Sequence, residues 1–146
     1  MKLSTRAQYG VRLMLGLAIR HGKGYTRLND IARSEGISEK YLSLIVIPLR
    51  GLGLVNSTRG VHGGYALARD PSQITVKEIV DALEGDNAIV DCVRNASACS
   101  RVPICVSRDI WTILEDKIAE TLRGITLDQL IRMGEEKVDR ALSHDI

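Results

Sequence analysis

The sequence predicts a mainly α-helical fold that contains a winged helix-turn-helix, a small β-hairpin wing and a long C-terminal helix. A helix-like segment from Leu28 to Ser34 leads into a three-residue turn that contains Gly36, and Ser38 then opens a second helix. Two short apolar runs, 54–55 and 65–67, flank the turn-rich segment RGVHGG, whose glycines can supply the positive φ angles of a tight hairpin. Helix, turn, helix and hairpin in this order make a winged helix.

The first helix is expected to begin after Ser4, which can cap it, and to end near His21 before Gly22 and Gly24. Four apolar residues share one face of this helix and are expected to pack into the core: Val11, Met14, Leu15 and Ala18. Lys2 stands at its basic start, where it either contacts a phosphate or is simply part of a solvated helix end.

The second helix of the pair carries a stripe for burial, made of Leu42, Ile45, Leu49 and Leu52. In a helix-turn-helix this second helix enters the DNA major groove. The stripe leaves Lys40, Ser43, Leu44 and Ile47 facing outward. Lys40 and Ser43 can donate to base edges or phosphates, and Tyr41 can reach a phosphate from the flank. Leu44 and Ile47 either contact thymine methyl groups or pack on a neighbour, and Pro48 should kink the helix.

The distribution of charge along the chain favours a DNA-binding winged helix over a plain helical bundle. Residues 1–69 carry eleven Lys and Arg against three acids, a net charge of +8, while the remaining residues carry nine against fifteen, a net of −6. Such asymmetry predicts a polyanion partner for the first half only, and double-stranded DNA fits a winged helix. Arg59 at the wing tip is suited to a narrow minor groove. The expected DNA contacts are Lys2, Ser38, Lys40, Tyr41, Ser43, Leu44, Arg50, Arg59 and His62.

The DNA-binding domain is expected to span residues 1–85. Thr75 and Glu78 form a capping-box pattern at the start of its last short helix, which Gly85 ends. The apolar face of that helix is assigned to the core, with no chemistry. At 146 residues the chain can form one good core, and it has no apolar run long enough to span a bilayer and no secretory signal. We therefore expect a cytoplasmic protein without a membrane partner.

Residues 86–106 form a polar loop that holds all three cysteines, Cys92, Cys99 and Cys105, spaced C-x6-C-x5-C. Nearby arginines, Arg94, Arg101 and Arg108, favour thiolates. Structural zinc usually has C-x2-4-C pairs, which are absent, so iron–sulfur is the better metal prediction. From spacing alone, a metal centre, a redox thiol loop and inert cysteines remain open.

Residues 107–134 are expected to form a long helix over 107–123 and a short closing helix capped at Thr126, followed by a charged tail over 135–146. One stripe of the long helix is apolar: Trp111, Leu114, Ile118 and Leu122, widened by Ile110 and Ile113. So broad an apolar surface outside a small domain is typical of a helix that packs against a partner subunit. The 107–123 helix is therefore predicted to hold a homodimer together.

Taken together, these residues resemble the Rrf2 family of winged-helix repressors, over residues 1 to about 132. The resemblance rests on MKLSTRAQYGVRLML, ISEKYL, PLRGLGLV, RGVHGGYAL, the three-cysteine loop and ITLDQL. It implies a homodimeric DNA-binding repressor rather than an enzyme, and no general base, nucleophile or substrate-binding constellation accompanies the cysteines. In cysteine-bearing members it also implies an iron–sulfur cluster held by three cysteines, here Cys92, Cys99 and Cys105, that senses iron–sulfur status, redox state or nitric oxide.

Two departures from the family pattern leave the fourth cluster ligand open. Arg108 stands where members of the IscR type have a histidine, and Gln8 stands where the NsrR type has an acidic ligand. The remaining candidates are Asp91, Asp109, His62 or an external ligand, and a 4Fe–4S cluster is favoured over 2Fe–2S. The alternative is a cluster-free regulator of the CymR type. Ser43 and Leu44 also replace the Glu and Gln that are frequent in IscR-like members, so the target sequence cannot be carried over.

Overall fold

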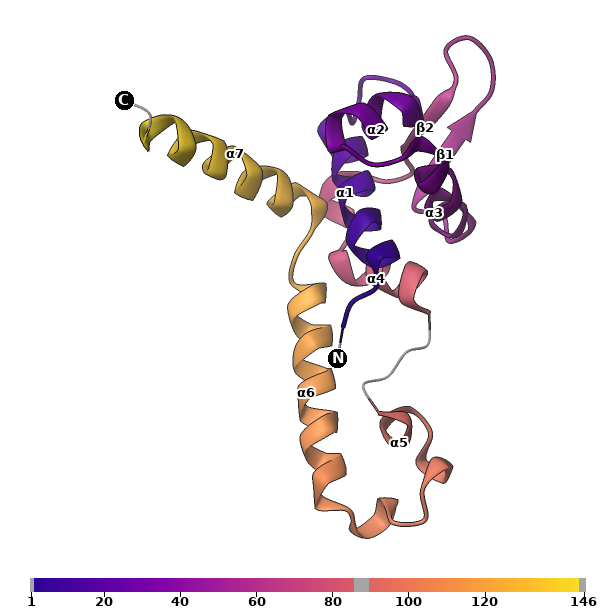
Figure 1. Cartoon of the computed structure of the whole chain (residues 1–146), viewed down its shortest axis with the longest axis vertical. Coiled ribbons are helices and arrows are strands. Elements are labelled where there is room, and N and C mark those ends of the chain that lie inside the picture. The colour runs from indigo at the N-terminus through magenta and orange to yellow at the C-terminus, as the bar shows by residue number, and fades with distance from the viewer. Residues whose placement is uncertain (1, 86–89, 145–146) are drawn as a thin grey trace.

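The computed structural model describes residues 2–85 and 90–144. A compact helical body carries the hairpin at one end, and two long helices, α6 and α7, lead away from it in different directions (Figure 1). In chain order the helices and strands are α1 Thr5–Ile19, α2 Leu28–Glu35, α3 Glu39–Gly51, β1 Val55–Thr58, β2 Gly64–Leu67, α4 Val76–Glu84, α5 Asp91–Arg94, α6 Val106–Arg123 and α7 Leu127–His144. Single 3-10 turns lie at Pro71–Gln73, Ala96–Ala98 and Val102–Ile104.

The core lies where α1, α3 and α4 pack together. Its large, fully buried side chains include residues of α1, α2, α3 and α4 and Ile74 just before α4: Leu13, Met14, Leu17, Ile31, Leu42, Ile45, Leu49, Ile74 and Ile79. Burying one such side chain stabilises the fold by about 1.5–3 kcal/mol. At Gly10 of α1 a Cβ atom would collide with the Leu83 side chain, so the absence of a side chain lets α4 approach α1 closely.

The helix-turn-helix forms as the sequence predicts. Helix α2 ends at Gly36, whose φ of 65° lies in the left-handed region that glycine adopts readily. Ser38 then caps α3, with its side chain accepting a hydrogen bond from the Tyr41 backbone N–H at 3.3 Å. The expected helix pair and its cap are therefore confirmed.

The wing is a two-stranded antiparallel hairpin in which Val55 pairs with Leu67 and Thr58 with Gly64. It is also joined to the segment before α2, because Thr26 and Tyr65 exchange two backbone hydrogen bonds, both 2.8 Å long. Gly64 makes this junction possible: its φ is 149°, and a Cβ there would stand 2.6 Å from the Thr26 carbonyl carbon. The wing is thus joined to the segment before α2 by backbone hydrogen bonds.

The turn between the two C-terminal helices is hydrogen-bonded to the body. The predicted capping box of α4 is present, with Thr75 and Glu78 bonded reciprocally. Just beyond it, the Val76 N–H donates to the Ile125 carbonyl at 2.8 Å and the Leu127 N–H donates to the Ile74 carbonyl at 3.0 Å. These bonds fix the turn between α6 and α7 to the start of α4.

Three expectations about the helices are wrong in detail. Leu52 is exposed rather than buried, since α3 ends at Gly51 and the stripe ends with it. In α1 the stripe is shifted, with Leu13 and Leu17 fully in the core and Val11 only half-buried. The closing helix is not short: α7 passes through Gly134 and runs to His144, so the 135–146 segment begins as helix rather than as a frayed tail.

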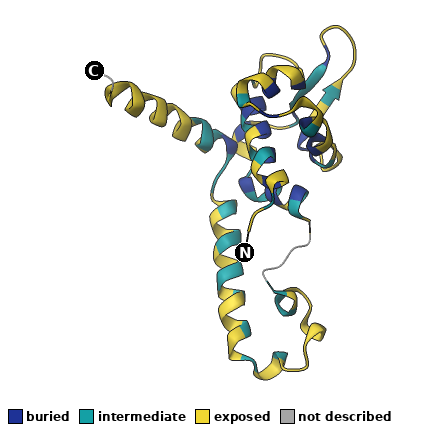
Figure 2. Ribbon diagram, viewed as in Figure 1, coloured by how far each residue is buried: buried dark blue, intermediate teal, exposed yellow. Residues whose placement is uncertain are grey.

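Burial divides the molecule into a packed body and exposed arms (Figure 2). Leu127 is the buried residue of α7, and α6 has none. Every helix among the described residues is too short or too polar to cross a lipid bilayer.

Candidate nucleic-acid interface and cysteine loop

The outer face of α3 is largely exposed. Lys40 and Ser43 are exposed, and Leu44 and Ile47 retain 58% and 63% of their accessible surface. The Ser43 hydroxyl donates to the Lys40 carbonyl at 2.6 Å. The helix therefore presents a row of polar and apolar side chains that stay largely exposed among the residues the structure describes, as expected for the helix that enters a groove.

The start of α3 is held rigidly by contacts that the sequence did not reveal. The Tyr41 ring is half-buried against the Tyr9 ring of α1, edge to face, with centroids 5.5 Å apart. The Arg12 guanidinium lies 5.5 Å from the Tyr9 ring centroid and its Nε atom is 3.1 Å from the Glu35 carboxylate. Helix α1 thus positions the α2–α3 turn, and a hollow lies beside it, lined by Tyr9, Ile37, Ser38, Lys40, Tyr41 and Leu44.

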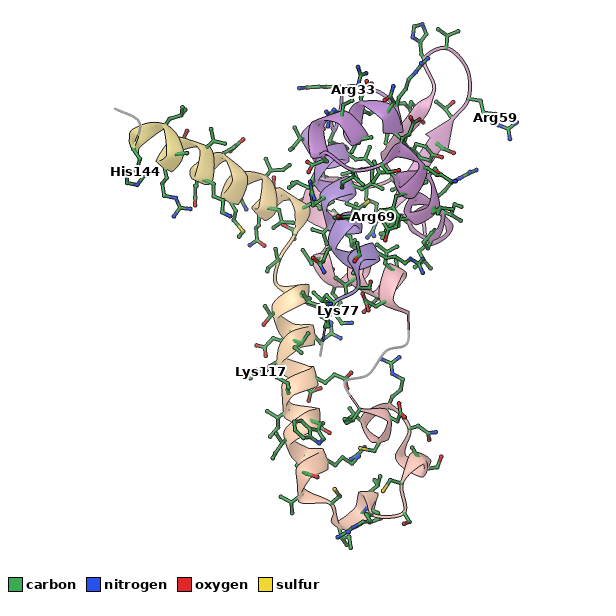
Figure 3. The ribbon with its side chains drawn as sticks, in the orientation of Figure 1. Arg33, Arg59, Arg69, Lys77, Lys117 and His144 are labelled. Carbon is green, nitrogen blue, oxygen red and sulfur yellow. The ribbon has the colours of Figure 1, made fainter. Side chains whose placement is uncertain are left out.

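The wing places Arg59 at its far end, where the side chain points away from the body (Figure 3). The other side of the wing is held by Arg27, whose Nη2 atom donates to the Val61 carbonyl at 2.7 Å. Lys23, Arg27 and His62 line a second hollow between the wing and the α1–α2 connection. Sequence patterns did not single out Lys23 or Arg27, because their position beside the wing depends on the fold and not on their spacing.

The remaining expected contacts, Lys2 and Arg50, are both exposed, and Arg50 lies in the last turn of α3. The chain start lies at the end of the body opposite the wing (Figure 1). There the Ser4 backbone N–H donates to Glu84 Oε1 at 2.8 Å. The expected DNA contacts therefore form one group on α3, a second on the wing, and an outlying position at Lys2.

The described part of the cysteine loop, residues 90–105, lies at the far end of α6 from the body, beside the start of that helix (Figure 1). Cys92 is on α5, Cys99 follows the Ala96–Ala98 turn, and Cys105 caps α6; all three are free thiols. Arg108 Nε donates to the Cys92 carbonyl at 3.0 Å, which ties α5 to α6. Within the described ranges, no three His, Cys, Asp or Glu side chains stand close enough together to share one metal ion.

The polar surroundings of Cys105 favour the thiolate form of its side chain. A hydrogen bond with the Ser107 hydroxyl, 3.1 Å away, is the main cause that lowers the pKa of the Cys105 thiol, aided by the Arg108 and Ser107 backbone N–H groups and the charge of Arg101. Thiolates are the ligands that iron–sulfur clusters take from proteins. By donor chemistry the loop suits such a cluster, with three free thiols on one segment and a thiolate favoured at Cys105.

An exposed recognition helix, a basic wing and a rigid helical body define a winged-helix DNA-binding regulator. Comparison with known proteins gives the particular family: the pattern of the Rrf2 family, described as iron-dependent transcriptional regulator, matches residues 3–133. The chain belongs to the Rrf2 family of transcriptional regulators. It is a regulator and not an enzyme, which confirms the resemblance seen in the sequence.

Relatives within the family cover most of the chain. The regulator CymR of Bacillus subtilis is 38% identical over 130 residues, 89% of each protein, and the Rrf2 protein of Nitratidesulfovibrio vulgaris is 39% identical over 132 residues, 90% of this chain and 88% of that one. The solved structure of IscR from T. potens superimposes with a TM-score of 0.77 at 36% identity, covering 94% of this chain and 90% of that one. The chain is thus similar to regulators of both the CymR and the IscR type.

Proposed function

We propose that the protein is a homodimeric repressor whose operator binding is controlled by an iron–sulfur cluster on residues 86–106. The observation that carries the proposal is the separation of two surfaces at opposite ends of the molecule. The outer face of α3 and the wing face away from the body at one end, and three free thiols gather on one loop at the other. Helix α6 connects the two.

In the proposed complex, α3 enters the major groove and the wing reaches the adjacent minor groove. Lys40 and Arg50 on α3 and Arg59 on the wing supply positive charge for the phosphates and the narrow groove. Tyr41 contributes its hydroxyl from a ring already held against Tyr9. The proposed contact set is Lys2, Ser38, Lys40, Tyr41, Ser43, Leu44, Arg50, Arg59 and His62.

Alanine variants test this docking on a duplex selected by the protein from a random-sequence pool. Lys40→Ala should weaken binding across sequences and lower the slope of log affinity against log salt by about one. Arg59→Ala should lose affinity mainly on sites with a narrow minor groove. The control is Lys137→Ala, which removes the same charge from the exposed face of α7, outside α3, the wing and the proposed dimer helix. The docking is wrong if Lys40→Ala and Arg59→Ala bind like this control.

The dimer is proposed to form through α6. Val106, Ile110 and Ile113 share one face of this helix and retain 75%, 54% and 62% of their surface. The neighbouring stripe of Leu114, Ile118 and Leu122 is half-buried. A helix with so much uncovered apolar surface fits a second copy of itself, and two-fold symmetry would space two recognition helices for a palindromic operator.

Cys92, Cys99 and Cys105 are the proposed cluster ligands, and 4Fe–4S is favoured over 2Fe–2S. A bound cluster would supply sensitivity to iron supply, oxidants or nitric oxide. Arg108 cannot be the fourth ligand, because a guanidinium stays protonated and has no lone pair to offer. His62 lies on the wing, at the opposite end of the molecule from α5, which leaves Asp91, Asp109, a partner-subunit group or an external ligand.

Since no three donors converge among the described residues, ligation requires the loop to rearrange. The hydrogen bond from Arg108 to the Cys92 carbonyl and the position of Cys105 at the first turn of α6 connect this loop to the helix. Rearrangement of the loop would thereby alter the placement of α6, and with it the spacing of the two recognition helices. Cluster loading would change the DNA affinity only by as much as the affinity differs between the arrangement of α6 with a bound cluster and the arrangement without one.

Anaerobic reconstitution with iron and sulfide tests the cluster, read by visible absorption and Mössbauer spectroscopy. We expect a cluster in the wild type, its loss in Cys99→Ala and its retention in Arg108→Ala. Ser100→Ala, a substitution beside Cys99 that leaves all thiols intact, is the matched control. Failure of the wild type to take up iron, or loss of the cluster in Arg108→Ala, would overturn the assignment.

The second candidate is a cluster-free regulator that responds to a small molecule, an oxidant or a protein partner. Two observations favour it: the donors do not converge within the described residues, and the pKa of Cys105 is lowered, chiefly by Ser107, which favours the thiolate form of this thiol. The similarity to CymR points the same way. This candidate expects iron-free protein to bind its operator as tightly as protein exposed to iron.

A further inference from the structure

The centre of the outer face of α3 is apolar. Leu44 and Ile47 lie between Lys40, one turn earlier, and Arg50, one turn later, and they keep 58% and 63% of their surface. Gly51 continues the same face, with open space where its side chain would be. No other element of the described chain covers Leu44 or Ile47, so the packing that the sequence left open does not occur within the chain.

The same face has little capacity for reading bases through hydrogen bonds. The Ser43 hydroxyl donates its proton to the Lys40 carbonyl at 2.6 Å. The Ser43 hydroxyl oxygen can then act toward DNA only as an acceptor. Positions 44, 47 and 51 hold Leu, Ile and Gly, with no amide, guanidinium or carboxylate. Discrimination among bases in the middle of the helix must therefore come from apolar contact.

The major groove offers one apolar group, the C5 methyl of thymine, and aliphatic side chains contact it favourably. The cations flanking the apolar pair also fit DNA, because phosphates line both sides of the groove that a recognition helix enters. The same cations disfavour a second copy as the occupant, since a symmetric contact would bring Lys40 and Arg50 close to their equivalents.

We propose that Leu44 and Ile47 determine operator specificity by contacting thymine methyl groups in the centre of each half-site. The inference rests on the proposed function, since it requires α3 to lie in the major groove. It adds the kind of sequence that is read: half-sites with thymines facing α3, recognised by methyl contact rather than by paired hydrogen bonds.

The test uses the duplex selected from a random pool and copies of it in which single thymines are replaced by deoxyuridine, which lacks only the methyl group. Losing one buried methyl should lower affinity about four-fold. We expect this loss at one or two thymines per half-site and none at thymines outside the site. With Leu44→Ala, wild-type discrimination between thymine and deoxyuridine should disappear at one of those positions, and with Ile47→Ala at another.

Both substitutions replace exposed residues by the best helix former, so the fold should be retained, as circular dichroism can check. If the selected duplex binds equally well with every thymine replaced, the methyl inference fails while the proposed function stands. If no duplex binds above the level of random DNA, the proposed function fails as well. If the alanine variants bind both duplexes like wild type but change the sedimentation coefficient, the patch is a protein interface and the inference is wrong.

Discussion

Replacing Gly64 by alanine tests how the wing is held to the body. An added Cβ would meet the Thr26 backbone, 2.6 Å from its carbonyl carbon, at a φ of 149° that side chains rarely adopt. The two hydrogen bonds between Thr26 and Tyr65 would break, at about 0.5–1.5 kcal/mol each, and the backbone strain adds about 1–3 kcal/mol. The expected loss of unfolding free energy is about 2–6 kcal/mol.

Urea denaturation followed by circular dichroism measures this loss. With a slope of about 2 kcal/mol per molar, the midpoint should fall by about 1–3 M. Hydrogen exchange should show the Tyr65 amide losing protection, and DNA binding should lose the contribution of Arg59 because the wing is no longer fixed.

Gly134→Ala is the matched control for the same chemical change. Gly134 lies inside α7 with open space around it, so alanine should stabilise the helix by about 0.5–1 kcal/mol. The reasoning about the junction is refuted if Gly64→Ala keeps the wild-type midpoint and a protected Tyr65 amide.

Substitutions at three further places test the helix cap of α4, the pKa of Cys105 and the proposed dimer face. Thr75→Ala should lower the unfolding free energy by about 1 kcal/mol by removing the capping box of α4, whereas Thr75→Ser should retain most of it in thermal or urea unfolding. Ser107→Ala removes the hydrogen bond that chiefly lowers the pKa of Cys105, so this pKa should rise; the pH profile of Cys105 alkylation by iodoacetamide in iron-free protein should move to higher pH, and an unmoved profile would contradict the assignment. Ile110→Glu combined with Ile113→Glu should give folded monomers in sedimentation velocity, and a persistent dimer would exclude this face of α6 as the interface.

Local sequence signals predicted the elements that depend on local chemistry. Gly36 and Ser38 marked the turn and cap of the helix pair, and Thr75 with Glu78 marked the start of α4, because each acts within one turn of chain. The motifs also identified the Rrf2 family correctly.

Contacts between distant residues left no such signal. Arg12 with Glu35, and Arg27 with the Val61 carbonyl, join residues 23 and 34 positions apart, and neither pair has a characteristic spacing. The length of α7 was missed for a different reason. Gly134 disfavours a helix, and the sequence therefore predicted that the helix ends there. Val138 and Leu142 continue the apolar stripe that begins at Leu127, and the helix runs on through Gly134 to His144.

The central claim is that iron–sulfur loading at the cysteine loop changes DNA affinity. The most direct measurement is an anaerobic fluorescence-anisotropy titration of the selected duplex at fixed salt, with one preparation divided into iron-loaded and iron-free halves, beside Cys99→Ala treated in the same way. If cluster loading controls binding, the dissociation constants should differ about ten-fold between the two wild-type halves and should coincide for Cys99→Ala. Equal affinity of loaded and iron-free wild-type protein would contradict it.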